Sequence, residues 1–99
     1  MKKFNLKNGL TLVVDNYAFN NNATSLILLE NGEPLAHATT YLEELKDLYT
    51  KDIVTIKNYS ENEGIEKLLD EVLETRLGVI ATEYTEVPLY KIKDEFIEA

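Results

Sequence analysis

The chain has 99 residues, with ten Lys or Arg, eighteen Asp or Glu and one His, and its formal net charge is −8. A chain of this length is expected to form one domain over residues 1–99, because domains typically contain about 100–150 residues. The absence of Cys excludes disulfides, thiolate zinc sites and cysteine nucleophiles. Since His37 is the only histidine, a multi-histidine metal site within one chain is excluded as well.

The first sixty residues are dominated by β-strand signals. Extended segments are predicted over residues 4–7, 10–14, 25–30, 34–41 and 52–59. The dipeptides Asn8-Gly9 and Asn31-Gly32 predict hairpin turns, because Asn and Gly accept the positive φ angles that type I′ turns need. The run Asn20-Asn21-Asn22 is typical of a loop for the same conformational reason. These signals together predict an antiparallel sheet.

A main helix is predicted over residues 61–76. Ser60 and Glu63 have the spacing of a capping box, in which each side chain binds a backbone N–H at the start of a helix. The apolar residues that follow recur at helical period, and they are Ile65, Leu68, Leu69 and Val72. Gly78 is placed to end this helix, and Arg76 is placed to interact with the negative end of its dipole.

The remaining segments are less distinctive. Residues 42–50 carry leucines at three-residue intervals, which predicts a short helix of one or two turns. Residues 79–83 and 87–93 look extended, and residues 94–99 form a short polar tail with Phe96 and Ile97 as candidate anchors. The predicted fold class is α+β, with an antiparallel sheet of about four or five strands packed on one main helix.

The acidic residues are unevenly distributed, since residues 1–29 contain only Asp15 and the other seventeen acids lie in residues 30–99. A helical wheel of the predicted main helix places its acids on the solvent side, and they are Glu63, Glu66, Asp70, Glu71 and Glu74. Their spacing of about 5 Å along the axis is too sparse to copy a nucleic-acid strand. Neighbouring segments would have to add acids, and these are Glu30, Glu33, Glu43, Glu44 and Asp47. The alternative is a solvated face that serves solubility.

Catalytic chemistry is disfavoured by the residue pattern. No Asp-x-Asp ligand pattern or Gly-rich phosphate loop is present, and no cofactor is expected. His37 lacks a nucleophile motif beside it, so a structural or surface role is favoured over a general base or pH switch. The six tyrosines are flanked by acids and not by the lysines of a base-stacking platform. They are expected to pack in the core with hydroxyls at the rim, or else to anchor a protein interface.

One segment carries a family resemblance, and it reads Lys57-Asn58-Tyr59-Ser60-Glu61-Asn62-Glu63-Gly64-Ile65. With residues 12–18 and 30–34, it resembles a signature of a small family of unknown function encoded by bacterial phages and other mobile elements. The resemblance covers about the first two thirds of the chain, and Glu66 to Glu74 depart from the family pattern. A weaker likeness links the segment to acidic phage inhibitors of CRISPR effectors. The resemblance implies a phage-borne protein and supplies no catalytic residues.

The sequence therefore predicts a non-enzymatic protein that inhibits a host defence protein, such as a CRISPR nuclease, by covering its basic nucleic-acid-binding surface. The candidate contact residues are Glu43, Glu44, Asp47, Glu63, Glu66, Asp70, Glu71 and Glu74. Direct binding to nucleic acid is disfavoured because the acidic chain repels phosphates. No membrane span or signal peptide is predicted, so the host cytoplasm is the expected location. The alternative is a small homodimeric module whose edge strand, residues 87–93, pairs two copies.

Overall fold

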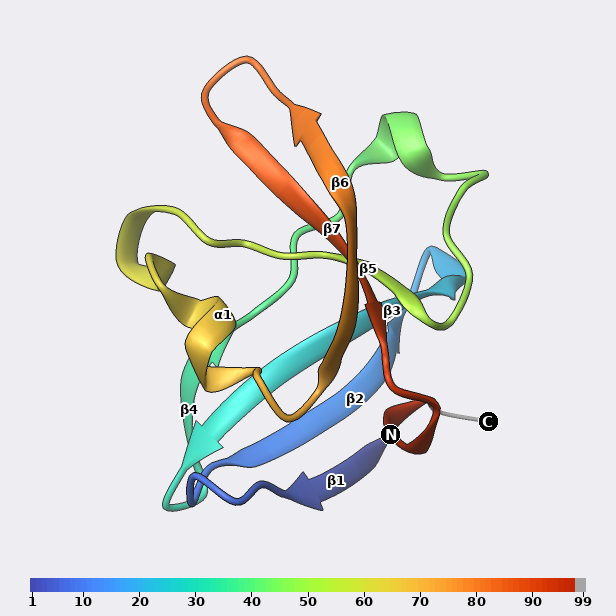
Figure 1. The fold of residues 1–99 in the computed structure, drawn as a ribbon. Coiled ribbons are helices and arrows are strands. Elements are labelled where there is room, and N and C mark those ends of the chain that lie inside the picture. The colour runs from blue at the N-terminus through green and yellow to red at the C-terminus, as the bar shows by residue number, and fades with distance from the viewer. Residues whose placement is uncertain (98–99) are drawn as a thin grey trace.

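The computed structural model describes residues 1–97 and consists of two antiparallel sheets (Figure 1). The first sheet has the strand order β1-β2-β3-β4, with β1 at Lys2–Asn5, β2 at Thr11–Tyr17, β3 at Asn20–Glu30 and β4 at Glu33–His37. The second has the order β5-β7-β6, with β5 at Ile53–Thr55, β6 at Leu73–Ala81 and β7 at Glu86–Ile92.

Helical structure is confined to single turns. The 3₁₀ turns are η1 at Glu43–Leu45, η2 at Ser60–Asn62 and η3 at Asp94–Phe96. The α-helix α1 spans only Ile65–Leu68. The protein is therefore mostly β, and the predicted α+β fold with one main helix is wrong.

The first sheet follows the local signals of the sequence closely. Asn31 and Gly32 have φ angles of 53° and 84°, which confirms the predicted type I′ turn between β3 and β4. Asn20-Asn21-Asn22 was expected to be a loop and instead begins β3. Here the Asn20 side chain donates hydrogen bonds to Tyr41 Oη and to the carbonyl of Lys46, so tertiary contacts hold the asparagine run extended.

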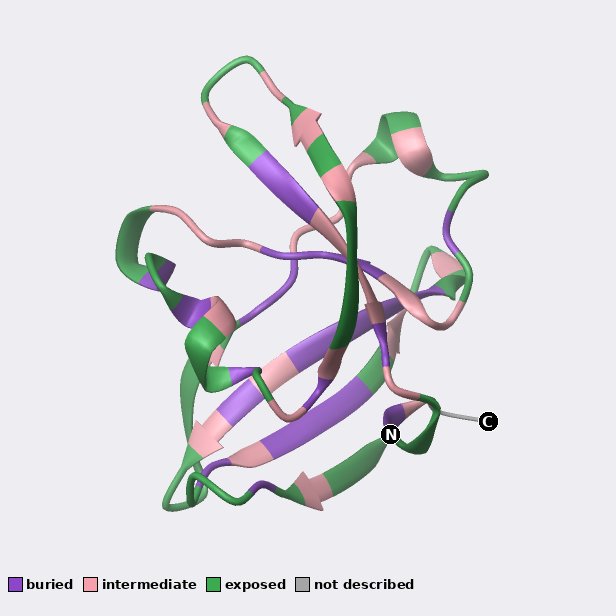
Figure 2. Cartoon of the chain, viewed as in Figure 1, coloured by how far each residue is buried: buried purple, intermediate pink, exposed green. Residues whose placement is uncertain are grey.

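Both sheets contribute to one hydrophobic core. Leu12, Val14, Leu26 and Leu28 of the first sheet are fully buried, and they meet Ile92 of the second. Figure 2 shows this buried stripe along β2 and β3, with the mostly exposed β6 crossing above it. Alternation along β2 and β3 places one set of side chains in this core, because successive strand residues point to opposite faces.

The segment after β4 joins the two sheets. Thr39 forms an isolated antiparallel bridge with Ile56. On either side of the bridge, Thr40 N–H donates to the Thr55 carbonyl and Lys57 N–H donates to the Ala38 carbonyl. The sheets are thus connected by backbone hydrogen bonds as well as by the shared core.

The predicted helix over residues 61–76 is replaced by short turns and a strand. Ser60 has a φ angle of 56° and makes no capping hydrogen bond, so the capping box does not form. Gly64 follows with a φ angle of 83°, and only the four residues of α1 are α-helical before β6 begins at Leu73. The apolar stripe is still largely buried, because Ile65, Leu69 and Val72 all enter the core.

Pairing with β7 explains why residues 73–81 are extended. Arg76 lies opposite Tyr90 and Gly78 opposite Leu89 in the register of β6 and β7. The expected roles of Arg76 at a helix end and of Gly78 as a helix stop are therefore wrong. Seven of the nine residues of β6 have register partners on β7, a strand that lies later in the chain, and this pairing outweighs a helical period of apolar residues over a short window.

One further expectation needs correction. The short helix predicted over residues 42–50 is reduced to the single 3₁₀ turn η1, because Tyr49 folds back and its hydroxyl accepts a hydrogen bond from Leu42 N–H. In the polar tail, the candidate anchor Phe96 is buried and packs edge-on against Phe4, with ring centroids 5.1 Å apart. Residues 98–99 of that tail lie outside the described residues.

Candidate protein-binding surface

The structure divides the eight predicted contact acids between two places. Glu43, Glu44 and Asp47 lie in and beside η1, whereas the other five lie between η2 and the first half of β6. Figure 1 shows these two segments, green and yellow, on opposite sides of the molecule. The expected single acidic face is therefore not formed.

Three of the five acids in the second group are engaged within the protein. Glu66 accepts hydrogen bonds from Tyr90 Oη and, at 3.2 Å, from Asn58 Nδ2. Glu71 accepts a 2.7 Å hydrogen bond from Lys7 N–H. Glu74 forms an ion pair with Lys91 at 3.2 Å, and this pair raises the pKa of the lysine. These three carboxylates make contacts within the protein. They are therefore less available to a partner protein than carboxylates that contact only solvent.

Lysines also accompany this second group. A shallow hollow of about 370 Å³ is lined by Lys7, Lys67 and Lys93 together with Asp70 and Glu71. Because opposite charges lie on the same hollow, the local electrostatic potential is weakened there. The segment between α1 and β6 is therefore a poor candidate for a strongly acidic binding face.

The first group lies beside a cluster of aromatic rings. Tyr41 contacts three other rings, with centroid distances of 4.6 Å to Phe19, 5.1 Å to Tyr49 and 5.3 Å to Tyr17. Phe19 is 69% exposed although it is a large apolar side chain, whereas Tyr49 is only 5% exposed. The cluster therefore runs from the surface at Phe19 to the interior at Tyr49.

Hydrogen bonds hold the acidic segment against these rings. Tyr49 Oη bonds to Leu42 N–H at 3.0 Å and to Thr55 Oγ1 at 2.8 Å. Asn20 Nδ2 donates to Tyr41 Oη at 3.1 Å and to the Lys46 carbonyl at 3.3 Å. Both ends of the segment are thus fixed, while its carboxylates remain exposed.

We define the aromatic–acidic surface by seven residues: Tyr17, Phe19, Tyr41, Tyr49, Glu43, Glu44 and Asp47. Its three acidic residues are exposed, and their carboxylates make no ion pair or hydrogen bond within residues 1–97. Aromatic anchors beside charged residues are a common composition of protein interfaces. The sequence pointed to the acids and the tyrosines, but it gave no signal for an exposed Phe19 ring, because that exposure depends on how Tyr17 and Tyr41 pack against it.

A second arrangement concerns the lone histidine. Ser25 Oγ and His37 Nε2 lie 3.0 Å apart across β3 and β4, and Tyr17 stacks on the His37 ring with centroids 6.3 Å apart. The sequence offered no nucleophile near His37, because a regular hairpin around Asn31-Gly32 would place His37 opposite Leu26. The register shift between Leu28 and Leu29 moves His37 opposite Ile27 and thus onto the face of Ser25. Desolvation, followed by the positive charge of Lys57, lowers the pKa of His37.

The Ser25 and His37 pair lacks further features of an acyl-transfer site. Ser25 is buried, and no carboxylate binds His37 Nδ1 among the described residues. Nor does any group of three His, Asp or Glu residues within positions 1–97 gather closely enough to hold a metal ion. In a nucleophilic triad the base is oriented by a third group, so this pair is better described as a cross-strand hydrogen bond.

No protein-family model, curated protein or solved structure matches this chain. The resemblance to the phage-encoded family stays a prediction from the sequence. Among the helices in residues 1–97, none has the length and apolar character required to cross a membrane.

Proposed function

We propose that this chain is a non-enzymatic binding protein that covers a basic surface of a partner protein through the aromatic–acidic surface. The observation that carries the proposal is the exposed Phe19 ring packed on Tyr41, together with the unpaired carboxylates of Glu43, Glu44 and Asp47, which follow Tyr41 closely in the chain. An exposed ring supplies apolar contact area, and the carboxylates select a partner that presents Lys or Arg.

The setting of this function follows from the sequence resemblance. A phage-encoded protein in the cytoplasm of its bacterial host would meet defence nucleases whose nucleic-acid channels are basic. Occupying such a channel would inhibit the nuclease by steric and electrostatic competition, without a cofactor. The net charge of −8 supports this choice of partner, because it favours association with cations and opposes contact with nucleic acid itself.

The test is a binding and inhibition assay with purified CRISPR nucleases, each measured with and without guide RNA. The triple variant Glu43→Lys, Glu44→Lys, Asp47→Lys should abolish binding, and Phe19→Ala should weaken it by about tenfold or more. A matched control reverses Asp70, Glu83 and Glu86, whose carboxylates are also exposed and unpaired among residues 1–97. This control changes the net charge equally and should retain most of the binding.

Salt dependence provides a second readout. Binding should weaken steeply as salt is raised, because exposed charges are screened over about 8–10 Å at physiological ionic strength. Equal loss of binding in both triple variants would show that only the overall charge matters. Failure to bind or inhibit any such nuclease would refute the anti-defence role.

The competing function is a homodimeric module joined at a sheet edge. Residues 87–93 cannot form that edge along their length, because β7 lies between β5 and β6. The outer strands of this sheet are β5, with only three residues, and β6, whose register shifts between Leu73 and Thr75 and again between Arg76 and Gly78. Such bulges disrupt continued strand pairing, so the structure favours the partner-binding function. Molar mass from light scattering separates the two.

A further inference from the structure

A second surface follows the free edge of β4. This strand pairs with β3 on one side and has no strand on its other side within residues 1–97. Four of its five residues are exposed, and Leu35 retains 46% of its accessible surface. The segment from Lys57 to Leu68 forms the opposite wall.

Two adjoining hollows make a continuous trough between these walls. One, of about 160 Å³, is lined by Leu35 and Ala36 on one side and by residues 61–65 and Leu68 on the other. The second, of about 380 Å³, shares Leu35, Ala36, Glu61 and Asn62 and extends to Ile27 and His37. We call this feature the β4 trough. Apolar side chains line both of its walls, with Leu35 and Ala36 on one wall and Ile65 and Leu68 on the other.

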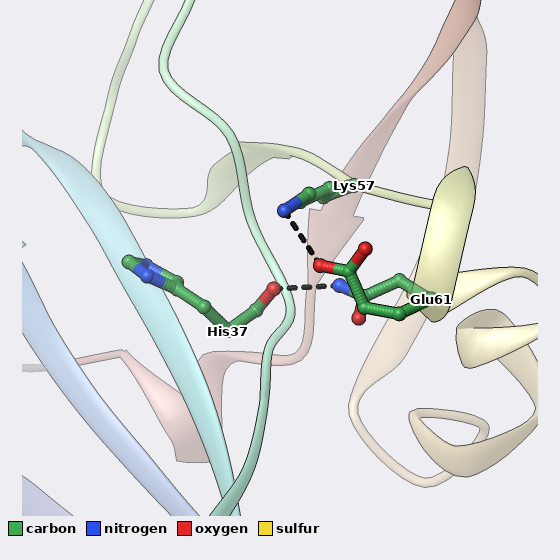
Figure 3. Close-up of polar contacts among 4 residues, drawn as sticks. His37, Lys57 and Glu61 are labelled. Carbon is green, nitrogen blue, oxygen red and sulfur yellow. Dashed lines mark hydrogen bonds and ion pairs between the residues drawn. The ribbon is translucent and has the colours of Figure 1, made fainter.

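The backbone of β4 faces this trough at its C-terminal end. Ala38 N–H donates to the Leu26 carbonyl, so the preceding carbonyl, that of His37, points away from β3. This carbonyl accepts a 2.7 Å hydrogen bond from Asn62 Nδ2. Figure 3 shows the His37 carbonyl turned toward the Glu61 segment while its ring points away. Because N–H and C=O of one strand residue point to the same side, His37 N–H also faces outward.

Asn62 therefore occupies the place that a neighbouring strand would take at one end of the edge. Its side chain is 5% exposed, so this contact is a fixed part of the fold. Among the described residues, the rest of β4, from Glu33 to Ala36, has no such cover, although Pro34 has no N–H to donate to an added strand. Leu35 lies at a register shift and has no register partner on β3.

The charges around the trough are mainly negative. Glu61 and Glu63 lie on the wall opposite β4, while Glu33 and its cross-strand neighbour Glu30 lie at the open end. Lys57 pairs with Glu61 at 3.0 Å and is the only Lys or Arg that lines either hollow among the described residues. The Glu63 carboxylate makes no ion pair or hydrogen bond within residues 1–97.

We propose that the β4 trough binds an extended segment of a partner protein in which basic and aliphatic residues alternate. The segment adds to the edge of β4 as a strand, places aliphatic side chains against Leu35 and Leu68, and directs Lys or Arg toward Glu63 and Glu33. Strand addition supplies main-chain hydrogen bonds, and pockets for alternate side chains supply specificity. A second copy of this chain fits less well, because its basic segment Lys2–Asn5 is already paired as β1.

The test uses the acetylated, amidated peptide Lys-Val-Lys-Val-Lys and the full chain labelled with ¹⁵N. Amide shifts should change at residues 33–37 and 61–65. The same peptide with both valine nitrogens methylated keeps its charge and side chains but loses two donors, and it should bind at least about tenfold more weakly. Equal binding of the two peptides, shifts centred elsewhere, or no shifts at millimolar peptide would each overturn the proposal.

Variants distinguish this site from the aromatic–acidic surface. Glu63→Lys should weaken peptide binding by about tenfold, because it replaces attraction with repulsion close to the peptide. Glu83→Lys makes the same charge change on the turn between β6 and β7 and should weaken binding by less than about twofold. Phe19→Ala changes the aromatic–acidic surface and does not touch the trough, so it should leave peptide binding unchanged. The peptide test therefore stands or fails independently of the function proposed above. Equal effects of Glu63→Lys and Glu83→Lys would contradict a specific trough.

Discussion

The two acidic regions of this protein contain the same kinds of residue and differ in what the fold does with them. In the segment around η1, Glu43, Glu44 and Asp47 are exposed and unpaired within residues 1–97. Between η2 and β6, by contrast, Glu66 binds Tyr90, Glu71 binds the backbone of Lys7, and Glu74 binds Lys91. A carboxylate that already accepts hydrogen bonds within the protein has fewer free lone pairs and a fixed orientation when a partner approaches, so acidic composition alone does not define a binding surface.

The difference also shows in how each segment is supported. The η1 segment is held from below by the buried Tyr49, and its acids take no part in that support. In the second region, the acids themselves connect distant parts of the chain. Glu66 and Tyr90, for example, are separated by 24 positions. Mutation of the acids in the first region should therefore change partner binding and leave the unfolding free energy unchanged. Mutation of the engaged acids in the second region should change the unfolding free energy as well.

The largest expected effect comes from Tyr49→Ala. This change removes a buried ring that stacks on Tyr41 and a hydroxyl that binds Leu42 and Thr55. Loss of a buried aromatic side chain typically costs about 3–5 kcal/mol of unfolding free energy, measurable by urea denaturation. Tyr84→Ala is the matched control, because Tyr84 is 90% exposed, and it should change stability by less than about 0.5 kcal/mol. Similar losses in both variants would contradict the anchoring role of Tyr49.

An intermediate effect is expected for Glu66→Ala. The variant leaves Tyr90 Oη and Asn58 Nδ2 without their acceptor. Hydrogen bonds to charged groups contribute up to about 3 kcal/mol, and partial exposure here reduces the expected loss to about 1–2 kcal/mol. Glu63→Ala removes a nearby carboxylate without a partner and should stay within about 0.5 kcal/mol. If the two variants unfold at the same urea concentration, the distinction between engaged and free acids fails.

The smallest expected effect is a pH dependence of the unfolding free energy that arises from His37 and not from the acidic residues. The pKa of His37 is lowered in the folded protein, first by desolvation and then by Lys57, from the ordinary value of 6.5. Between the lowered pKa and 6.5 the unfolded chain binds more protons, so stability falls as pH decreases below about 6.5. The decrease ends once pH passes below the folded pKa.

NMR titration measures this pKa directly, because the single histidine gives an unambiguous ring signal. His37→Gln should remove the stability loss just below pH 6.5 and leave the later loss, at the pH where carboxylates protonate. A folded pKa at or above 6.5 would contradict the expected direction.

Local signals predicted the first sheet because its strands are neighbours in sequence. The Asn31-Gly32 turn needs only positive φ angles at two adjacent residues, and such a requirement is visible in the dipeptide itself. The same kind of reasoning failed at Ser60, where the capping spacing is present but the backbone adopts a left-handed conformation. A capping box requires the helix that follows it, and here Gly64 and the start of β6 limit that helix to four residues.

The candidate site was predicted in part for a related reason. The acids of the η1 segment lie in an exposed turn, so their availability follows from local sequence. The carboxylates of Glu66 and Glu71 are engaged by Tyr90 and by the backbone of Lys7. Because both partners lie outside residues 61–76, the sequence pattern within that segment could not predict these contacts. Phe19 was missed because its exposure depends on how Tyr17 and Tyr41 pack beneath it.

The sequence by itself determined the acidic charge, the strands of the first sheet, the turn at Asn31-Gly32, and the burial of Ile65, Leu69 and Val72. Only the tertiary structure decided that residues 73–81 form a strand and which carboxylates remain free. The physical reason is that strand pairing and side-chain hydrogen bonds join residues far apart in the chain. Hydrophobic period and turn chemistry, by comparison, act between near neighbours.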